Sequence, residues 1–244
     1  MEIPRKAWLD YIAKLSKINK KAAQLMQEWI DANGYGSIEK MIAMANGLVQ
    51  KYGEASASLA CEMYDNIASA SGVVLPPSTP ADVMAEDYVA ATIRKVYDNA
   101  PTTIPNVVER IVKQAGADTT LQNAKRDGAQ FAWIPSGDTC AFCIALASRG
   151  WQYMSKNALK NGHAEHIHSN CDCNYSIRFD SKSGVAGYDP KRYEKIYYDA
   201  DGKTANEKIN AMRRENYAKN REKILEQKKI AYQVKKELND DGTV

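Results

Sequence analysis

The stretch HAEHIHSNCDC, residues 163–173, contains all three histidines of this 244-residue chain and two of its five cysteines. Two further cysteines lie upstream in CAFC, residues 140–143. Together the two segments form a C-x-x-C pair followed by an H-x-x-C-x-C pattern. A C-x-x-C turn places two thiolates on one side of a tight loop, and four such ligands suit a tetrahedral zinc ion. The spacing therefore predicts a metal site that joins the two segments.

Five side chains compete for the four positions of a tetrahedral site: Cys140, Cys143, His168, Cys171 and Cys173. One of Cys171 and Cys173 is then expected to lie beside the metal without binding it. Because ligands are in surplus, we expect a closed structural zinc rather than a catalytic zinc, which keeps one position for water. His163 and His166 lie outside the H-x-x-C-x-C spacing, so we expect them to be solvated or to support the ligands.

Other interpretations of the cysteines fit the sequence less well than a metal site. A metal-free hairpin with apolar cysteines fits poorly with His166, Asn170 and Asp172 close by, and a redox dithiol lacks a thioredoxin-like strand and helix around it. A catalytic metalloprotease motif, H-E-x-x-H, is absent, whereas HIHSN loosely resembles a histidine–asparagine nuclease site. The fifth cysteine, Cys61, falls on the apolar side of a predicted helix and is expected to be a small core residue.

The segments around the cysteines predict a small α+β module over residues 128–182. FAWIP (131–135) and NYSIRFD (174–180) have the branched and aromatic content of strands, and the second alternates apolar and polar residues. Between them, AFCIALASRG (141–150) predicts a short apolar helix. In a module of this size a structural zinc supplies much of the folding free energy.

Residues 1–127 predict a helical domain. The first helix has one apolar face, made by Trp8, Ile12, Leu15, Ala22, Met26 and Trp29. A second helix is expected from Ser37 to about Ser71, and a third, capped by Thr79, to about Asn99. Two short helices are expected over residues 106–116 and 118–129. Trp8 and Trp29 belong either to the core or to a surface that anchors a protein partner.

Residues 183–244 predict a loop followed by an extended basic helix. Eleven basic and four acidic residues lie between positions 203 and 236, a local net charge of +7 in a chain whose net charge is only +3. Such a helix is either a solvated charged face or a surface that attracts nucleic-acid phosphates without reading sequence. The chain lacks the roughly 20-residue apolar run of a membrane span and the apolar core of a signal peptide, so we expect no membrane contact and reduced cysteines.

Three segments resemble the Mu-F-like (MuF) minor head proteins of tailed bacteriophages, in particular those of phages from Gram-positive hosts. The segments are GDTCAFCIALASRGWQYMS (137–155), HIHSNCDCNYSI (166–177) and GYDP (187–190), so the resemblance covers about residues 128–190. It implies a mainly α virion protein without enzymatic activity, located in the capsid interior or at the portal vertex and assembled in the cytoplasm of the bacterial host. The implied partners are the portal protein, the major capsid protein and packaged double-stranded DNA. The five metal-ligand candidates fall at the positions that the family's module would use.

Two other functions remain open from the residues alone. One is a zinc-dependent nuclease or hydrolase, in which the histidines of HAEHIHSNCDC act on DNA. The other is a cellular zinc module that binds nucleic acid. Removing the metal should unfold the module if zinc is structural, but should abolish activity in a folded protein if zinc is catalytic.

Overall fold

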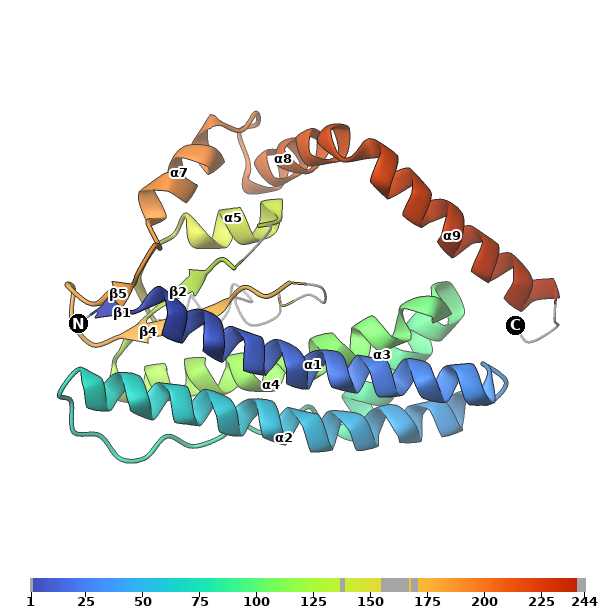
Figure 1. The fold of residues 1–244 in the computed structure, drawn as a ribbon, viewed down its shortest axis with the longest axis horizontal. Coiled ribbons are helices and arrows are strands. Elements are labelled where there is room, and N and C mark those ends of the chain that lie inside the picture. Colours follow the sequence, from blue (N-terminus) through green and yellow to red (C-terminus); the bar gives the residue numbers. More distant parts are fainter. Residues whose placement is uncertain (1, 137–138, 155–166, 168–170, 241–244) are drawn as a thin grey trace.

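A computed structural model describes residues 2–136, 139–154, 167 and 171–240, and it is mainly helical (Figure 1). Three long helices lie side by side: α1 (Arg5–Asn33), α2 (Ile38–Ala70) and α4 (Ile104–Asp127). A shorter helix, α3 (Glu86–Asn99), packs against α2 and α4 at one end of this bundle, and a single 3₁₀ turn, η1 (Pro101–Thr103), joins α3 to α4. The prediction of a mainly α chain is therefore confirmed.

The apolar stripe of α1 forms the predicted core contacts. Trp8 is fully buried, and Trp29 is partly buried against the second cluster of core residues. Both tryptophans therefore contribute to packing inside the bundle. Gly34, with a positive φ of 67°, ends α1 at the predicted NGYGS break, because glycine adopts the left-handed region without the steric cost that a Cβ adds.

The segment between α2 and α3 departs from the prediction. Thr79 does not cap a helix: its amide donates to Asn123 Oδ1 at 3.0 Å, and Asn123 Nδ2 donates to its carbonyl at 2.8 Å. The amide of Ala81 likewise donates to Thr119 Oγ1 at 3.0 Å. Side chains of α4 thus satisfy the backbone of this extended segment, and α3 begins only at Glu86.

The prediction of two short helices over residues 106–129 is wrong, because α4 is continuous. Gly116 was placed at the boundary between them, but it lies in the middle of α4 and against Ser56 of α2. A glycine that interrupts a helical pattern here marks close helix packing rather than a helix end. The helix ends at Gly128, which is in the left-handed conformation.

The predicted strands and the short helix of the module are present. Strand β2 (Gln130–Ile134) is central and antiparallel to both β3 (Gln152–Tyr153) and β4 (Asn174–Arg178), with Ile134 opposite Asn174. Helix α5 (Ala141–Ala147) packs against β2, and α4 packs against β4. One core cluster combines residues of α1, α2 and α4 with residues of this sheet, so the core crosses the boundary predicted at residue 127. The division at residues 127 and 182 stays a prediction.

A pairing that the sequence did not predict joins the first residues to the end of the module. Strand β1 (Glu2–Ile3) runs parallel to β5 (Gly184–Val185), with Ile3 opposite Val185. The amide of Ala186 continues the pairing by donating to the carbonyl of Ile3 at 2.9 Å. The chain around residue 185 is therefore held next to the beginning of α1.

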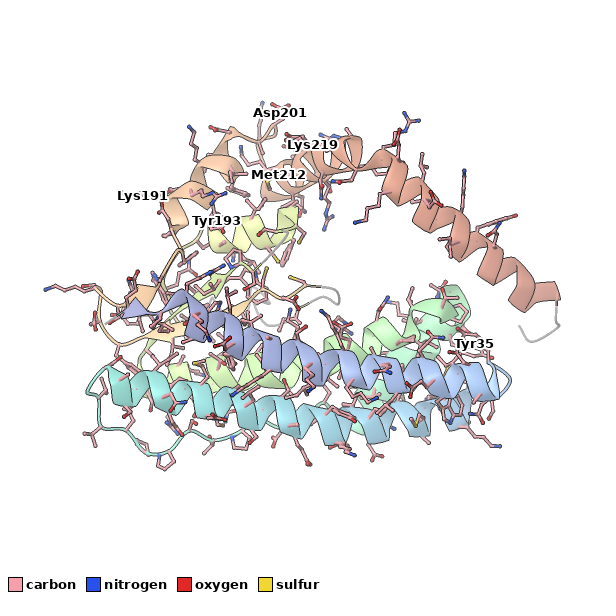
Figure 2. The ribbon with its side chains drawn as sticks, viewed as in Figure 1. Tyr35, Lys191, Tyr193, Asp201, Met212 and Lys219 are labelled. Atoms are coloured by element: carbon pink, nitrogen blue, oxygen red, sulfur yellow. The ribbon has the colours of Figure 1, made fainter. Side chains whose placement is uncertain are left out.

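Up to residue 240, the C-terminal region contains three helices rather than one extended helix: α7 (Pro190–Asp199), α8 (Ala205–Lys219) and α9 (Arg221–Asp240). The GYDP motif starts α7, because Asp189 caps it by accepting from the Lys191 amide at 3.0 Å and Pro190 fills the first position. Helices α7 and α8 cover α5, and Figure 2 shows Met212, which is buried, on the side of α8 toward α5. Helix α9, which we call the basic arm, slopes from the end of α8 toward the end of the bundle where α3 lies, and its ribbon stays apart from the bundle in this view (Figure 1). Among the described helices none has the length and hydropathy needed to cross a bilayer.

Candidate metal centre

Three cysteines from both predicted segments meet at one place. The sulfurs of Cys143, Cys171 and Cys173 all lie within 4.8 Å of one another, and the first two are 3.4 Å apart. Cys143 and Cys173 are fully buried and Cys171 is partly buried. Segments separated by nearly thirty positions therefore converge as the sequence spacing predicted.

Helix α5 positions the first segment. Cys140 occupies the N-cap of α5, where its Sγ accepts from the amide of Cys143 at 3.5 Å. This cap orients the first turn of α5 so that Cys143 points into the core. The rest of the helix, through Ala147, is apolar and mostly buried.

The sheet positions the second segment. Because Ile134 at the end of β2 is opposite Asn174 at the start of β4, the residues just after β2 and just before β4 are neighbours. The amide of Ser136 accordingly donates to Cys173 Sγ at 3.4 Å. The register of one strand pair thus places Cys171 and Cys173 beside the N-terminus of α5.

Among the described residues, three of the five predicted ligands form the cluster. Cys140 lies next to it through its contact with the Cys143 amide, but its Sγ is not within the 4.8 Å group. His168, together with His163 and His166, lies outside the described residues. Cysteine sulfurs at this separation fit a soft or borderline cation, and the identity of the ion and of the fourth ligand remain predictions.

The electrostatics of the cluster also suit a cation. Hydrogen bonds from the side chains of Cys143 and Cys173, with a smaller contribution from the charge of Lys113, hold the pKa of Cys171 far below its usual range. Hydrogen bonds to Cys140, Cys171 and Cys173 raise the pKa of Cys143. The lowered pKa of Cys171 favours its thiolate form, which is the form that binds a metal.

One residue of this site was missed by the sequence analysis. Lys113 lies in the middle of α4 and is only 4% exposed, and its ammonium donates to the carbonyl of Cys171. Its Nζ also lies 5.7 Å from the centroid of the Trp133 ring. Nothing in the local sequence distinguishes Lys113, because many helical lysines that extend to solvent have similar neighbours.

Comparison with known protein families gives a match over residues 2–200, which contain the helical bundle, the cysteine cluster and α7. The matching model describes VG15 proteins, and the chain belongs to this phage-associated family. This match supports the expectation of a bacteriophage protein. It does not distinguish a MuF-like minor head protein from other phage proteins. No curated protein and no solved structure matches the chain significantly.

Proposed function

We propose that this chain is a structural minor head protein of a tailed bacteriophage. In this proposal it sits at the portal vertex or in the capsid interior, contacts the portal protein and the major capsid protein, and touches packaged double-stranded DNA. Membership of the phage-associated VG15 family and the MuF-like segments support a virion role. The proposed role is structural, with a zinc ion that stabilises the fold and takes no part in a reaction.

The observation that carries the DNA contact is the charge pattern of the basic arm. Arg221, Leu225, Lys228 and Tyr232 follow one another at helical spacings of four, three and four residues, and all four are exposed. They therefore lie on one face of α9. Lys229, Glu222 and Glu226 each follow a member of the face by one position and so point about 100° away from that member.

An exposed cationic helix face suits the DNA backbone. Phosphate groups attract lysine and arginine without any need for base contacts, so binding of this kind tolerates every packaged sequence. The exposed ring of Tyr232, 71% exposed, and the side chain of Leu225 add contact area between the charges. The ammonium of Lys228 lies 5.5 Å from the centroid of the Tyr217 ring, which links the arm to α8.

The position of the cysteine cluster supports a structural metal. The three cysteines connect the first turn of α5 with the approach to β4, while Ser136 bonds Cys173 from the end of β2. A metal at this point would fix three elements relative to one another and would lie in the buried core. A catalytic metal instead requires a position open to substrate and water.

The direct test is the composition of virions. In the phage that encodes this chain, mass spectrometry of purified virions should detect it in few copies, and cross-linking should recover peptides of the portal protein.

Replacing Arg221, Lys228 and Lys229 together by Gln should leave the protein in the particle while DNA is packaged or retained less efficiently. A matched triple replacement of exposed lysines on α1, Lys14, Lys17 and Lys21, should not affect packaging. Absence of the chain from virions would refute the proposal, and zinc-dependent DNA cleavage by the purified protein would favour the nuclease alternative.

A further inference from the structure

The buried environment of Lys113 is unusual for a lysine. Its side chain is almost completely removed from solvent, and its polar partners are one backbone carbonyl, that of Cys171, and the face of the Trp133 ring. Within the described part of the chain, no carboxylate forms an ion pair with it. Burying an ammonium without an anionic partner is unfavourable, so lysines are rarely buried unless they are paired.

The surroundings of Lys113 exclude bulk water. A cavity of about 10 Å³ adjoins Lys113 together with Asn19, Cys171 and Asn174, and this volume holds roughly one water molecule. The ammonium therefore lies away from bulk solvent, where charges interact more strongly than at the surface. Any anion nearby would dominate its energetics.

Two anionic groups lie on this side of the protein: Asp172, which lines the same cavity but is paired with Lys20 at 3.7 Å, and the cysteine cluster. Lys113 bonds the backbone of Cys171, whose sulfur lies in the three-thiol group with Cys143 and Cys173. Three thiolates around a divalent cation leave the site with one excess negative charge, and a fourth thiolate would leave two. The ammonium of Lys113 is bonded to the backbone carbonyl of Cys171 and so lies close to one of these ligands. Its positive charge offsets part of the excess negative charge.

We propose that Lys113 is a positioning residue and the resident counter-charge of the thiolate metal site. Its ammonium fixes the carbonyl of Cys171, which orients that cysteine toward Cys143 and Cys173, and its charge stabilises the loaded thiolates. This inference rests on the metal site of the proposed function. It extends that site from the cysteine motifs to α4 and explains the location of a lysine inside the helical bundle.

The test measures metal affinity in the purified full-length chain. Zn²⁺ affinity would be determined by competition with a chromophoric chelator, and Co²⁺ would report thiolate coordination through its absorption. Lys113→Gln keeps a donor but removes the charge, Lys113→Met removes both, and Lys113→Arg keeps the charge. Lys125→Met, at an exposed position on the same helix, is the matched control.

We expect Gln and Met at position 113 to weaken Zn²⁺ binding by about 10- to 100-fold, the range seen when groups that support metal ligands are removed. The Arg variant should stay within about threefold of the original chain, as should Lys125→Met. In zinc-loaded protein, alkylation of the cysteines by iodoacetamide should be faster in the Gln variant, because the uncompensated thiolates are more nucleophilic. The alkylation rates of the two proteins are compared after circular dichroism has shown that their helix contents are equal.

Each outcome bears on the inference separately from the metal site itself. The inference would be overturned if Lys113→Gln bound Zn²⁺ as tightly as the unsubstituted chain, or if the Gln and Arg variants lost the same amount of Zn²⁺ affinity. Either result would show that the charge is not needed. If Lys113→Gln fails to fold, the Arg variant alone decides, since it should fold and bind Zn²⁺. Failure of the unsubstituted chain to bind Zn²⁺ or Co²⁺ would instead refute the metal centre.

Discussion

Gly116 of α4 lies so close to Ser56 of α2 that a Cβ at position 116 would be 2.6 Å from Ser56 Oγ and 3.1 Å from the Ser56 carbonyl oxygen. The two helices therefore pack at this point with no room for a side chain on α4. Ser56 is itself fully buried, so neither helix can move toward solvent without disturbing the core. This contact sets the distance between α2 and α4.

Gly116→Ala should destabilise the protein. The added methyl group forces the helices apart at a cost of about 1–3 kcal/mol, which exceeds the helix-propensity gain of at most about 1 kcal/mol. Gly47→Ala is the matched control, because a Cβ at this exposed position of α2 meets nothing within 4 Å and should stabilise the helix by roughly 0.5–1 kcal/mol. Urea unfolding of both variants measures the difference, and equal effects of the two substitutions would contradict the proposed packing.

Removing the metal should destabilise the folded chain. If zinc joins α5 to the sheet, a strong chelator should lower the melting temperature by roughly 10 °C or more, since site formation contributes several kcal/mol to folding. Cys143→Ser should abolish zinc binding and the response to chelator. Cys61→Ser, on α2 and outside the cluster, should retain both. A melting temperature that does not respond to chelator in zinc-loaded protein would argue against a structural metal.

Asp118 predicts a pH dependence. Burial raises the pKa of Asp118 to about 6 from 3.8, although the amide of Gln114 donates to its carboxylate at 2.8 Å. Because the pKa in the folded state lies above that in the unfolded state, protonation favours folding. This contribution is complete below about pH 4 and is lost as the pH rises through about 6.

Asp118→Asn should therefore stabilise the chain by roughly 1–3 kcal/mol at pH 7 to 8 and by much less at pH 4. An asparagine can still accept from Gln114, so the substitution removes the charge and keeps the hydrogen bond. The free energy of unfolding of both proteins, measured by urea between pH 4 and 8, gives the difference as a function of pH. A difference that does not vary over this range would show that Asp118 does not titrate there.

The basic arm predicts salt-dependent DNA binding. The unsubstituted chain should bind duplexes of unrelated sequence with similar affinity, which falls steeply as salt rises because condensed counterions are released. Replacing Arg221, Lys228 and Lys229 by Gln should reduce the slope of log affinity against log salt by up to about 0.9 for each lost phosphate contact. Fluorescence anisotropy at several salt concentrations measures this slope. An unchanged slope would place the DNA contact elsewhere.

Local patterns predicted most of the helices and strands of this chain. The 3.6-residue spacing of Trp8, Ile12 and Leu15 predicted the buried face of α1, and the branched residues of FAWIP and NYSIRFD predicted β2 and β4. The convergence of Cys143 with Cys171 and Cys173 followed from ligand spacing alone. Each of these signals is encoded within a few neighbouring residues.

The errors involve contacts between distant segments. Thr79 has the local sequence of a helix cap, but Asn123, 44 positions later, binds its backbone in an extended conformation. Gly116 has the local character of a helix break, but its role is set by Ser56 on another helix. Lys113 has no local signature at all, because only the folded chain brings it to Cys171. Such partners depend on tertiary structure, which overrides local propensity.

The pairing of β1 with β5 has a consequence for the order of events during synthesis. Glu2 pairs with Gly184, which the ribosome adds 182 residues later, so the first strand must wait unpaired while α1, α2 and α4 can already assemble. Contacts between such distant positions form late and slowly. We therefore expect the helical bundle to be the co-translational intermediate, and the joining of residues 2–3 to residues 184–185 to complete folding after the cysteine segments have emerged.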